Sequence, residues 1–127
     1  MPNISKTSDI LRMVKIIKAP IKKSELAEIA EEGFGDMVKA VVDVTQEIMA
    51  IGGELHVDEE VMLSEQEGSK RTDTWGINIY PEKSEEEWIE FDSMVNLKPA
   101  QENRSRSVES PEIREKIKNI VRKLIIE

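Results

Sequence analysis

The sequence predicts an α+β fold in which an antiparallel meander sheet of five or six strands is covered on one face by an early helix and a C-terminal helix. Segments of alternating, β-branched residues fill the middle of the chain, between residues 38 and 97. Apolar residues recur at helical spacing before and after these segments. The connections between the strand segments are short, which favours antiparallel neighbours.

The first two elements are a short strand and a helix. The apolar residues of "ILRMVKIIKAP" favour a strand over residues 13–17, and a helix beginning at Ser8 is the alternative. The next segment, "KSELAEIAEEGFG", places apolar residues on one helical face between a possible N-cap and two glycines. It predicts a helix over residues 25–34 with Ser24 as its N-cap.

Two further strands follow in "MVKAVVDVTQEIMAIGG". Alternation and β-branched residues predict a strand on each side of a tight turn near Thr45 and Gln46. Gly52 and Gly53 then end the second strand. A glycine pair at this point allows a bulge, a bend or the close approach of another backbone.

Residues 55–63 fit two structures. As a strand, the segment would place Leu55, Val57, Val61 and Leu63 on one face; as a helix, it would place His56, Glu59, Glu60 and Leu63 on one side. The apolar alternation favours the strand. We therefore expect a hairpin in which "EQEGSKRTD" is the turn and "TWGINIYP" is the second strand.

The last strand and the closing helix complete the predicted fold. "WIEFDSMVNLKP" alternates apolar and polar residues up to Pro99 and predicts a strand. After the loop "AQENRSRSVE", Ser110 and Pro111 are typical of a helix start, and the helix is expected over residues 111–125. Its apolar stripe consists of Ile113, Ile117, Ile120, Val121 and Leu124.

Length and charge indicate one acidic domain. The 127 residues suit a single core, so we expect a domain over residues 13–127 and an N-terminal extension over residues 1–12. A formal charge of −8 disfavours binding to nucleic acid. The basic N-terminal segment, with Lys6 and Arg12, contrasts with six acids between Glu54 and Glu67. These opposite charges suggest a possible homo-oligomer.

Cysteine content and hydropathy limit the kinds of site and the cellular compartment that we expect. The chain has no cysteine, which excludes disulfides, thiolate nucleophiles and cysteine-bound metal centres. It has no apolar run of the roughly 20 residues that cross a membrane and no secretory signal pattern. We therefore expect a cytoplasmic protein without a membrane partner.

Two polar segments are candidate sites. The lone histidine, His56, lies beside three acids, of which Asp58 and Glu60 are the candidate partners; such a group forms a base, a metal shell or a solvated surface cluster. The loop residues Asn103, Arg104 and Arg106 offer donors that suit carboxylate or phosphate groups. The alternative is that the arginines hold the loop against the acidic segment 54–67.

Recognised catalytic and nucleotide-binding motifs are missing. The sequence contains no HExxH, GxGxxG, P-loop or GxSxG pattern, and it specifies no cofactor. We therefore favour a non-enzymatic small-ligand-binding or protein-interaction module that self-associates and uses one polar patch, made from His56, Glu60 and the loop of residues 103–106. The alternative is a small hydrolytic enzyme assisted by a divalent metal, with the lone histidine and neighbouring acids at its centre.

Several segments also resemble a known family. "DMVKAVVDV", "IMAIGGELHVDEE", "WGINIYPE", "EWIEFDSMVN", "NRSR" and "EIREKI" together resemble a small bacterial family of uncharacterised single-domain proteins, a domain of unknown function. The resemblance extends from about Asp36 to Leu124. It implies a compact bacterial domain and assigns no catalytic residue.

Overall fold

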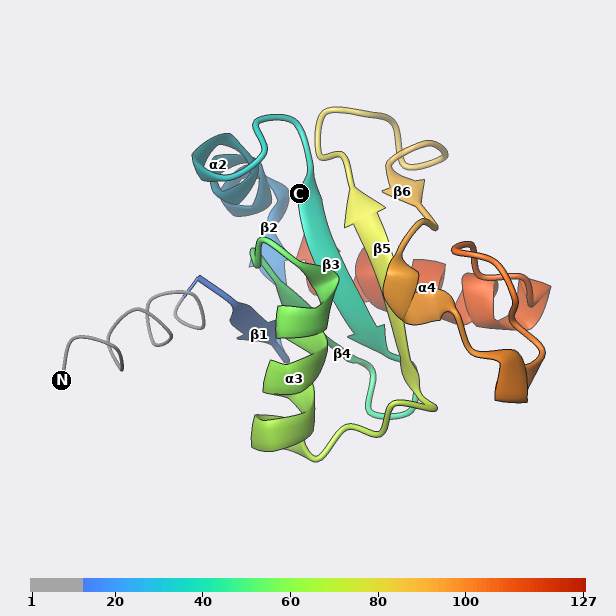
Figure 1. Cartoon of the computed structure of the whole chain (residues 1–127). Coiled ribbons are helices and arrows are strands. Elements are labelled where there is room, and N and C mark those ends of the chain that lie inside the picture. Colours follow the sequence, from blue (N-terminus) through green and yellow to red (C-terminus); the bar gives the residue numbers. More distant parts are fainter. Residues whose placement is uncertain (1–12) are drawn as a thin grey trace, which may run out of the picture.

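Five antiparallel strands form the central sheet of this computed structural model, which describes residues 13–127 (Figure 1). The predicted extension over residues 1–12, with Lys6 and Arg12, lies outside the described residues. Across the sheet the strands are β1 (Lys15–Ile17), β4 (Ile48–Ile51), β3 (Val38–Asp43), β5 (Thr74–Ile79) and β6 (Ile89–Glu90). The predicted α+β fold is confirmed.

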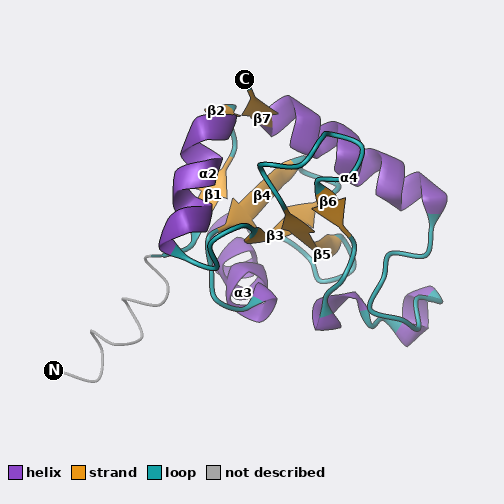
Figure 2. Ribbon diagram, turned by 90° about the horizontal axis from the view of Figure 1, so that it is seen from above, coloured by secondary structure: helices purple, strands orange, loops and turns teal. Residues whose placement is uncertain are grey.

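Three helices cover the two faces of this sheet. They are α2 (Lys23–Glu32), α3 (His56–Glu67) and α4 (Pro111–Leu124). Figure 2 shows α3 on one side of the sheet and both α2 and α4 on the other. A second, two-stranded sheet pairs β2 (Ile21–Lys22) in parallel with β7 (Ile125–Ile126), next to the ends of α2 and α4.

The larger core lies between the sheet and the pair α2 and α4. Alternation along each strand sends every second side chain to this face, including Ala40, Ile51 and Ile77, which are fully buried. The helices contribute Leu26, Ala30, Ile117, Ile120, Val121 and Leu124. The opposite face has a smaller core of Val14, Val41, Ile48, Ala50 and Leu63 beneath α3.

The ends of α4 follow the sequence prediction closely. The Ser110 side chain accepts a hydrogen bond from the Ile113 backbone N–H at 3.3 Å, and Pro111 occupies the first turn. The earlier helix is also confirmed, but its predicted cap is wrong. It begins at Lys23 with Lys22 as N-cap and no side-chain cap, so Ser24 lies inside the helix.

The strand expected over residues 55–63 is wrong, because the segment is the first part of α3. The residues that favoured a strand, Leu55, Val57 and Val61, are exposed. The buried residues of the helix are His56, Glu59, Glu60 and Leu63, which share one helical side. The expected hairpin with β5 is therefore also wrong, and β5 pairs with β3 instead.

The last predicted strand is much shorter than expected. After β6 the chain leaves the sheet and forms two 3-10 turns, η1 (Met94–Asn96) and η2 (Pro99–Gln101). Asn96 holds η1 against β5, because its side chain accepts from the Gly76 N–H at 2.8 Å and donates to the Gly76 carbonyl at 2.9 Å. A Cβ on Gly76 would lie 2.6 Å from the Cβ of Ser93, so this close approach requires glycine.

Candidate functional site

Two adjacent hollows open beside the start of α3. The larger, of about 450 Å³, lies between α2 and the start of β3, and the smaller, of about 380 Å³, lies between α3, β5 and η1. They share Met37, Lys39 and Leu55. We call the smaller one the His56 hollow; its polar lining includes His56, Lys39, Asn78, Glu90, Asp92 and Arg106.

A row of polar side chains crosses three strands at the base of the His56 hollow. In the sheet register Lys39 of β3 is opposite Asn78 of β5, and Asn78 is opposite Glu90 of β6. Opposed residues on neighbouring strands carry their side chains on the same face. The row therefore presents a cation, an amide and a carboxylate in that order on the face that α3 covers.

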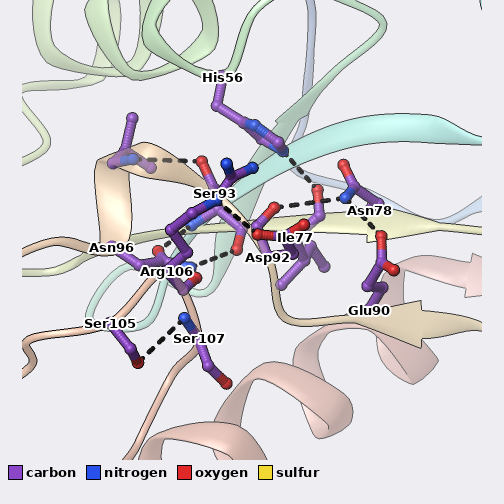
Figure 3. A network of polar contacts seen from close by, with 12 residues as sticks. His56, Ile77, Asn78, Glu90, Asp92, Ser93, Asn96, Ser105, Arg106 and Ser107 are labelled. Carbon is purple, nitrogen blue, oxygen red and sulfur yellow. Dashed lines mark hydrogen bonds and ion pairs between the residues drawn. The ribbon is translucent and has the colours of Figure 1, made fainter.

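His56 is the first residue of α3 and is held by the backbone of β5. Its Nε2 lies 2.8 Å from the carbonyl oxygen of Ile77 (Figure 3). Because a carbonyl only accepts, Nε2 carries the proton and Nδ1 is the ring's acceptor. Burial lowers the pKa of His56 below its usual value, and the charge of Lys39 adds to this, although the Ile77 bond opposes it. The ring is therefore neutral at pH 7.

Asn78 has an unsatisfied oxygen in the wall of the hollow. Its Nδ2 donates to Glu90 Oε1 at 2.8 Å and to the Asp92 carbonyl at 3.3 Å (Figure 3). Its Oδ1 is shut off from solvent and has no hydrogen-bond partner of regular geometry, although the Asn78 side chain helps to raise the pKa of the nearby imidazole. Unsatisfied buried oxygens are rare in folded proteins, and each calls for an explanation.

Two oppositely charged residues form the outer part of the hollow. Arg106 Nε donates to Asp92 Oδ1 at 2.7 Å, and both side chains are about half exposed. The pair is open to solvent and adds little to the free energy of unfolding. The pair does fix the position of the Arg106 side chain. The Arg106 backbone is held separately, because its carbonyl accepts from Ser93 N and from the Asn96 side chain.

The remaining wall of the hollow is apolar and open. Leu55, Val57 and Met94 line it with 53%, 48% and 62% of their surface exposed. Leu55 is the N-cap of α3 and offers no side-chain oxygen to the first turn of the helix. An apolar wall therefore lies next to an uncapped helix start and a row of polar groups.

The structure brings together only part of the predicted site. His56 and Arg106 line the same hollow, whereas Asp58, Glu60, Asn103 and Arg104 are not part of its lining. Glu60 faces away, since its Oε2 accepts from Thr74 Oγ1 at 2.9 Å and its Oε1 lies 3.9 Å from Arg71.

The predicted loop residues organise their own loop. Buried Asn103 donates to the carbonyls of Asn96, Ser105 and Ser107 and accepts from the Glu109 N–H. The Arg104 N–H donates to the Glu109 carboxylate at 2.9 Å. Arg106 pairs with Asp92 and not with the acidic segment 54–67, so its ion pair differs from the one the sequence suggested.

The polar row of the lining, Lys39, Asn78 and Glu90, was not among the sequence candidates for a site. Each lies on a strand, and only the pairing register brings the three together. One feature of the sequence pointed to Asn78. In "TWGINIYP" the residues Gly76 and Asn78 alternate with apolar residues, so the face of β5 that carries them is unsuited to an apolar core. Within residues 13–127, no group of three histidine, aspartate or glutamate side chains is placed to hold a metal ion.

Glu59 and Lys98 are two of the ionisable residues that are buried outside the hollow. Glu59 is fully buried; its Oε2 accepts from the Gly53 N–H at 2.9 Å, and its Oε1 has no partner. Burial raises the pKa of Glu59 well above its usual value. Lys98 donates to the carbonyls of Arg71 and Thr74 and lies 4.3 Å from the centre of the Trp75 ring. Both side chains bond to backbone groups of the fold and are not part of the candidate site.

Comparison with known proteins gives one match. Residues 15–124 match the family described as "protein of unknown function (DUF5674)". Neither the curated proteins nor the solved structures contain a match. No helix within residues 13–127 has the length and apolar character needed to cross a membrane. Because the match covers most of the chain, this protein belongs to the DUF5674 family of proteins of unknown function.

Proposed function

We propose that this protein is a non-enzymatic small-ligand-binding module and that its site is the His56 hollow. The observation that carries the proposal is that His56 and the polar row of Lys39, Asn78 and Glu90 line one hollow of about 380 Å³. That volume lies within the range of roughly 300–1,000 Å³ typical of small-molecule sites.

The contacts of His56 favour binding over catalysis. A histidine that acts as a catalytic base usually donates a hydrogen bond to a carboxylate from one ring nitrogen and accepts the reacting proton at the other. Here the ring donates to a backbone carbonyl, and its lowered pKa makes it a weaker base. Ser93, which also lines the hollow, accepts from the Val95 N–H at 3.3 Å. The bond to the Ile77 carbonyl therefore fixes the His56 ring as part of the wall of the site.

The larger hollow is a weaker candidate. Its lining is dominated by apolar side chains such as Met13, Ile29 and Phe34, with Glu32 and Lys39 at its edges. The described part of its lining contributes no buried, unsatisfied polar atom. An orientation-specific small-molecule site needs such polar groups, so we assign the ligand to the His56 hollow.

A fragment screen followed by NMR tests the proposal. We expect fragments that bind to shift the ring protons of His56 and the side-chain amide of Asn78. Arg106→Gln should weaken the bound fragments, and Arg104→Gln, two residues away on the same loop but outside the hollow, should not. A screen whose hits all perturb other surfaces, or no surface, would contradict the proposal.

We also propose that the protein self-associates in a bacterial cytoplasm. Exposed Met13 and Phe34, beside the larger hollow, provide an apolar surface for a second copy. The absence of cysteine suits a reducing compartment. Light scattering at low salt and high concentration tests the association, and a strict monomer under these conditions would contradict it.

A further inference from the structure

We propose that the ligand of the His56 hollow is a free α-amino acid with an apolar side chain. This inference rests on the proposed function and specifies its ligand. It follows from three groups of atoms that line one hollow: acceptors suited to an ammonium group, donors suited to a carboxylate, and an exposed apolar wall.

The acceptors lie around the centre of the polar row. Glu90 lies beside Asn78, Asp92 is a second carboxylate in the lining, and the neutral ring of His56 lines the same hollow. An ammonium group has three donors and no acceptor. It therefore matches this group of acceptors better than a hydroxyl or an ether oxygen does.

The donors lie on the other sides of the hollow. Lys39 is opposite Asn78 in the sheet and lines both hollows, and its Nζ lies 5.1 Å from the centre of the Phe34 ring. Arg106 uses Nε for Asp92, and the guanidinium has further N–H donors on its terminal nitrogens. The start of α3 has no side-chain cap and adds a partial positive charge. A ligand carboxylate has suitable partners here.

The balance of charge favours a ligand with both signs of charge. Two bases, Lys39 and Arg106, and two acids, Glu90 and Asp92, line the hollow together, and Arg106 already pairs with Asp92. Lys39 and Glu90, at the two ends of the polar row, remain for a ligand carboxylate and a ligand ammonium group. A zwitterion satisfies both sets, which is why we infer an amino acid.

The apolar wall indicates the side chain. Leu55, Val57 and Met94 are about half exposed or more, so a ligand side chain lying on them would remove apolar surface from water. A charged side chain would gain nothing there. Leucine and methionine have apolar side chains of suitable length and are the probes we would use.

Titration of the full chain with L-leucine and L-methionine, followed by NMR and calorimetry, tests the inference. 4-Methylpentanoate, which lacks the amino group, and 3-methylbutylamine, which lacks the carboxylate, are the matched compounds for leucine. We expect at least one amino acid to bind with shifts at His56 and Asn78. Each truncated compound should bind at least roughly tenfold more weakly, because it leaves one set of charged partners unsatisfied.

Variants then test the two ends of the ligand separately. Glu90→Gln should weaken the amino acid but leave 4-methylpentanoate unchanged, with exposed Glu87→Gln as its control. Arg106→Gln should weaken the amino acid but leave 3-methylbutylamine unchanged, with Arg104→Gln as its control. This crossed pattern is not produced by a general loss of folding.

The outcomes separate this inference from the proposed function. If neither amino acid binds while other fragments still shift His56 and Asn78, the amino-acid inference is wrong and the binding site remains. Equal binding of leucine and its two truncated analogues also overturns the inference. If no compound of any class binds in the hollow, both proposals fail.

Discussion

Glu59 shows at the scale of one residue how burial controls ionisation. The carboxyl group lies between α3 and the Gly53 backbone, and the Cβ of a residue at position 53 would be 3.0 Å from the Glu59 Cγ. One oxygen accepts from the Gly53 N–H and the other has no partner. Removing the proton would leave a charge with one hydrogen bond in the protein interior. The protonated form is therefore the stable one in the folded state.

We predict that Glu59 makes the protein less stable as the pH rises. Because burial raises the pKa of Glu59, folding takes up a proton above the unfolded value of about 4.5. Its contribution is constant below that pH and falls by about 1.4 kcal/mol per pH unit up to the folded pKa. Chemical unfolding of wild type and Glu59→Gln between pH 4 and 8 measures this contribution as a difference. Parallel curves for the two proteins would contradict the prediction.

Lys98 is the second residue whose burial leads to a prediction. It is 5% exposed, and its ammonium group donates to two backbone carbonyls above the Trp75 ring. Lys98→Ala removes the donor to the Thr74 carbonyl and leaves the Arg71 carbonyl with only the Thr74 hydroxyl, at 3.3 Å, as a donor. We expect a loss of about 2–4 kcal/mol in the free energy of unfolding. Urea unfolding measures it, and the exposed Lys70→Ala is the control; equal effects of the two would contradict the assignment.

The pKa of Lys98 gives the same residue a pH dependence. Burial lowers this pKa to about 8, so between that pH and about 10.5 the folded state binds fewer protons than the unfolded state. Stability relative to Lys98→Met should therefore rise as the pH increases through this window. Unfolding curves at pH 7.5 and 10 measure the change, and a constant difference between the two proteins would refute it.

At the scale of elements, regular periodicity determined what could be predicted. The helices at residues 25–34 and 111–125 and the strands around Thr45 and Gln46 have clear apolar periods, and each was predicted correctly. α3 was assigned as a strand because its buried side includes the polar residues His56, Glu59 and Glu60, whereas apolar Leu55, Val57 and Val61 are exposed. Propensity and pattern cannot reveal burial that depends on tertiary hydrogen bonds.

The same reason limits prediction of the candidate site. The sequence suggested that His56 and Arg106 belong to one patch, and both line the His56 hollow. It could not place Lys39, Asn78 and Glu90 beside them, because their proximity depends on the pairing of β3, β5 and β6. Register follows from the complete sheet and not from a local pattern.

The contact between β5 and η1 gives a prediction for Gly76. Gly76→Ala places a methyl group 2.6 Å from Ser93 and forces η1 away from the sheet. We expect a loss of about 1–3 kcal/mol in the free energy of unfolding and NMR shifts in residues 93–96. Weaker ligand binding should accompany them, because Ser93, Met94 and Val95 line the hollow.

Gly33→Ala is the matched control for this change. An added Cβ at Gly33 has only ordinary contacts, the nearest at 3.5 Å from the Ile29 carbonyl oxygen. It should leave residues 93–96 and the binding of fragments in the hollow unchanged. If both alanine variants behave alike, the close approach of η1 to β5 does not constrain the site.

On the scale of the whole molecule, α4 should be essential for folding. It contributes Ile117, Ile120, Val121 and Leu124 to the larger core. A chain ending at Ser110 would expose the sheet face beneath these side chains, and we expect it to be unfolded or aggregated. Circular dichroism and thermal unfolding measure this, with the full chain as the control. A soluble fragment of residues 1–110 that unfolds cooperatively would disprove the prediction.

The pairing of β2 with β7 also sets the order of events during synthesis. Ile21 pairs with Ile125, so the partner of β2 is made only after α2, the central sheet and α4. The edge of β2 is open to other strands throughout this interval. The pairing with β7 closes this edge, so any chaperone protection of β2 would be needed only until β7 has been made.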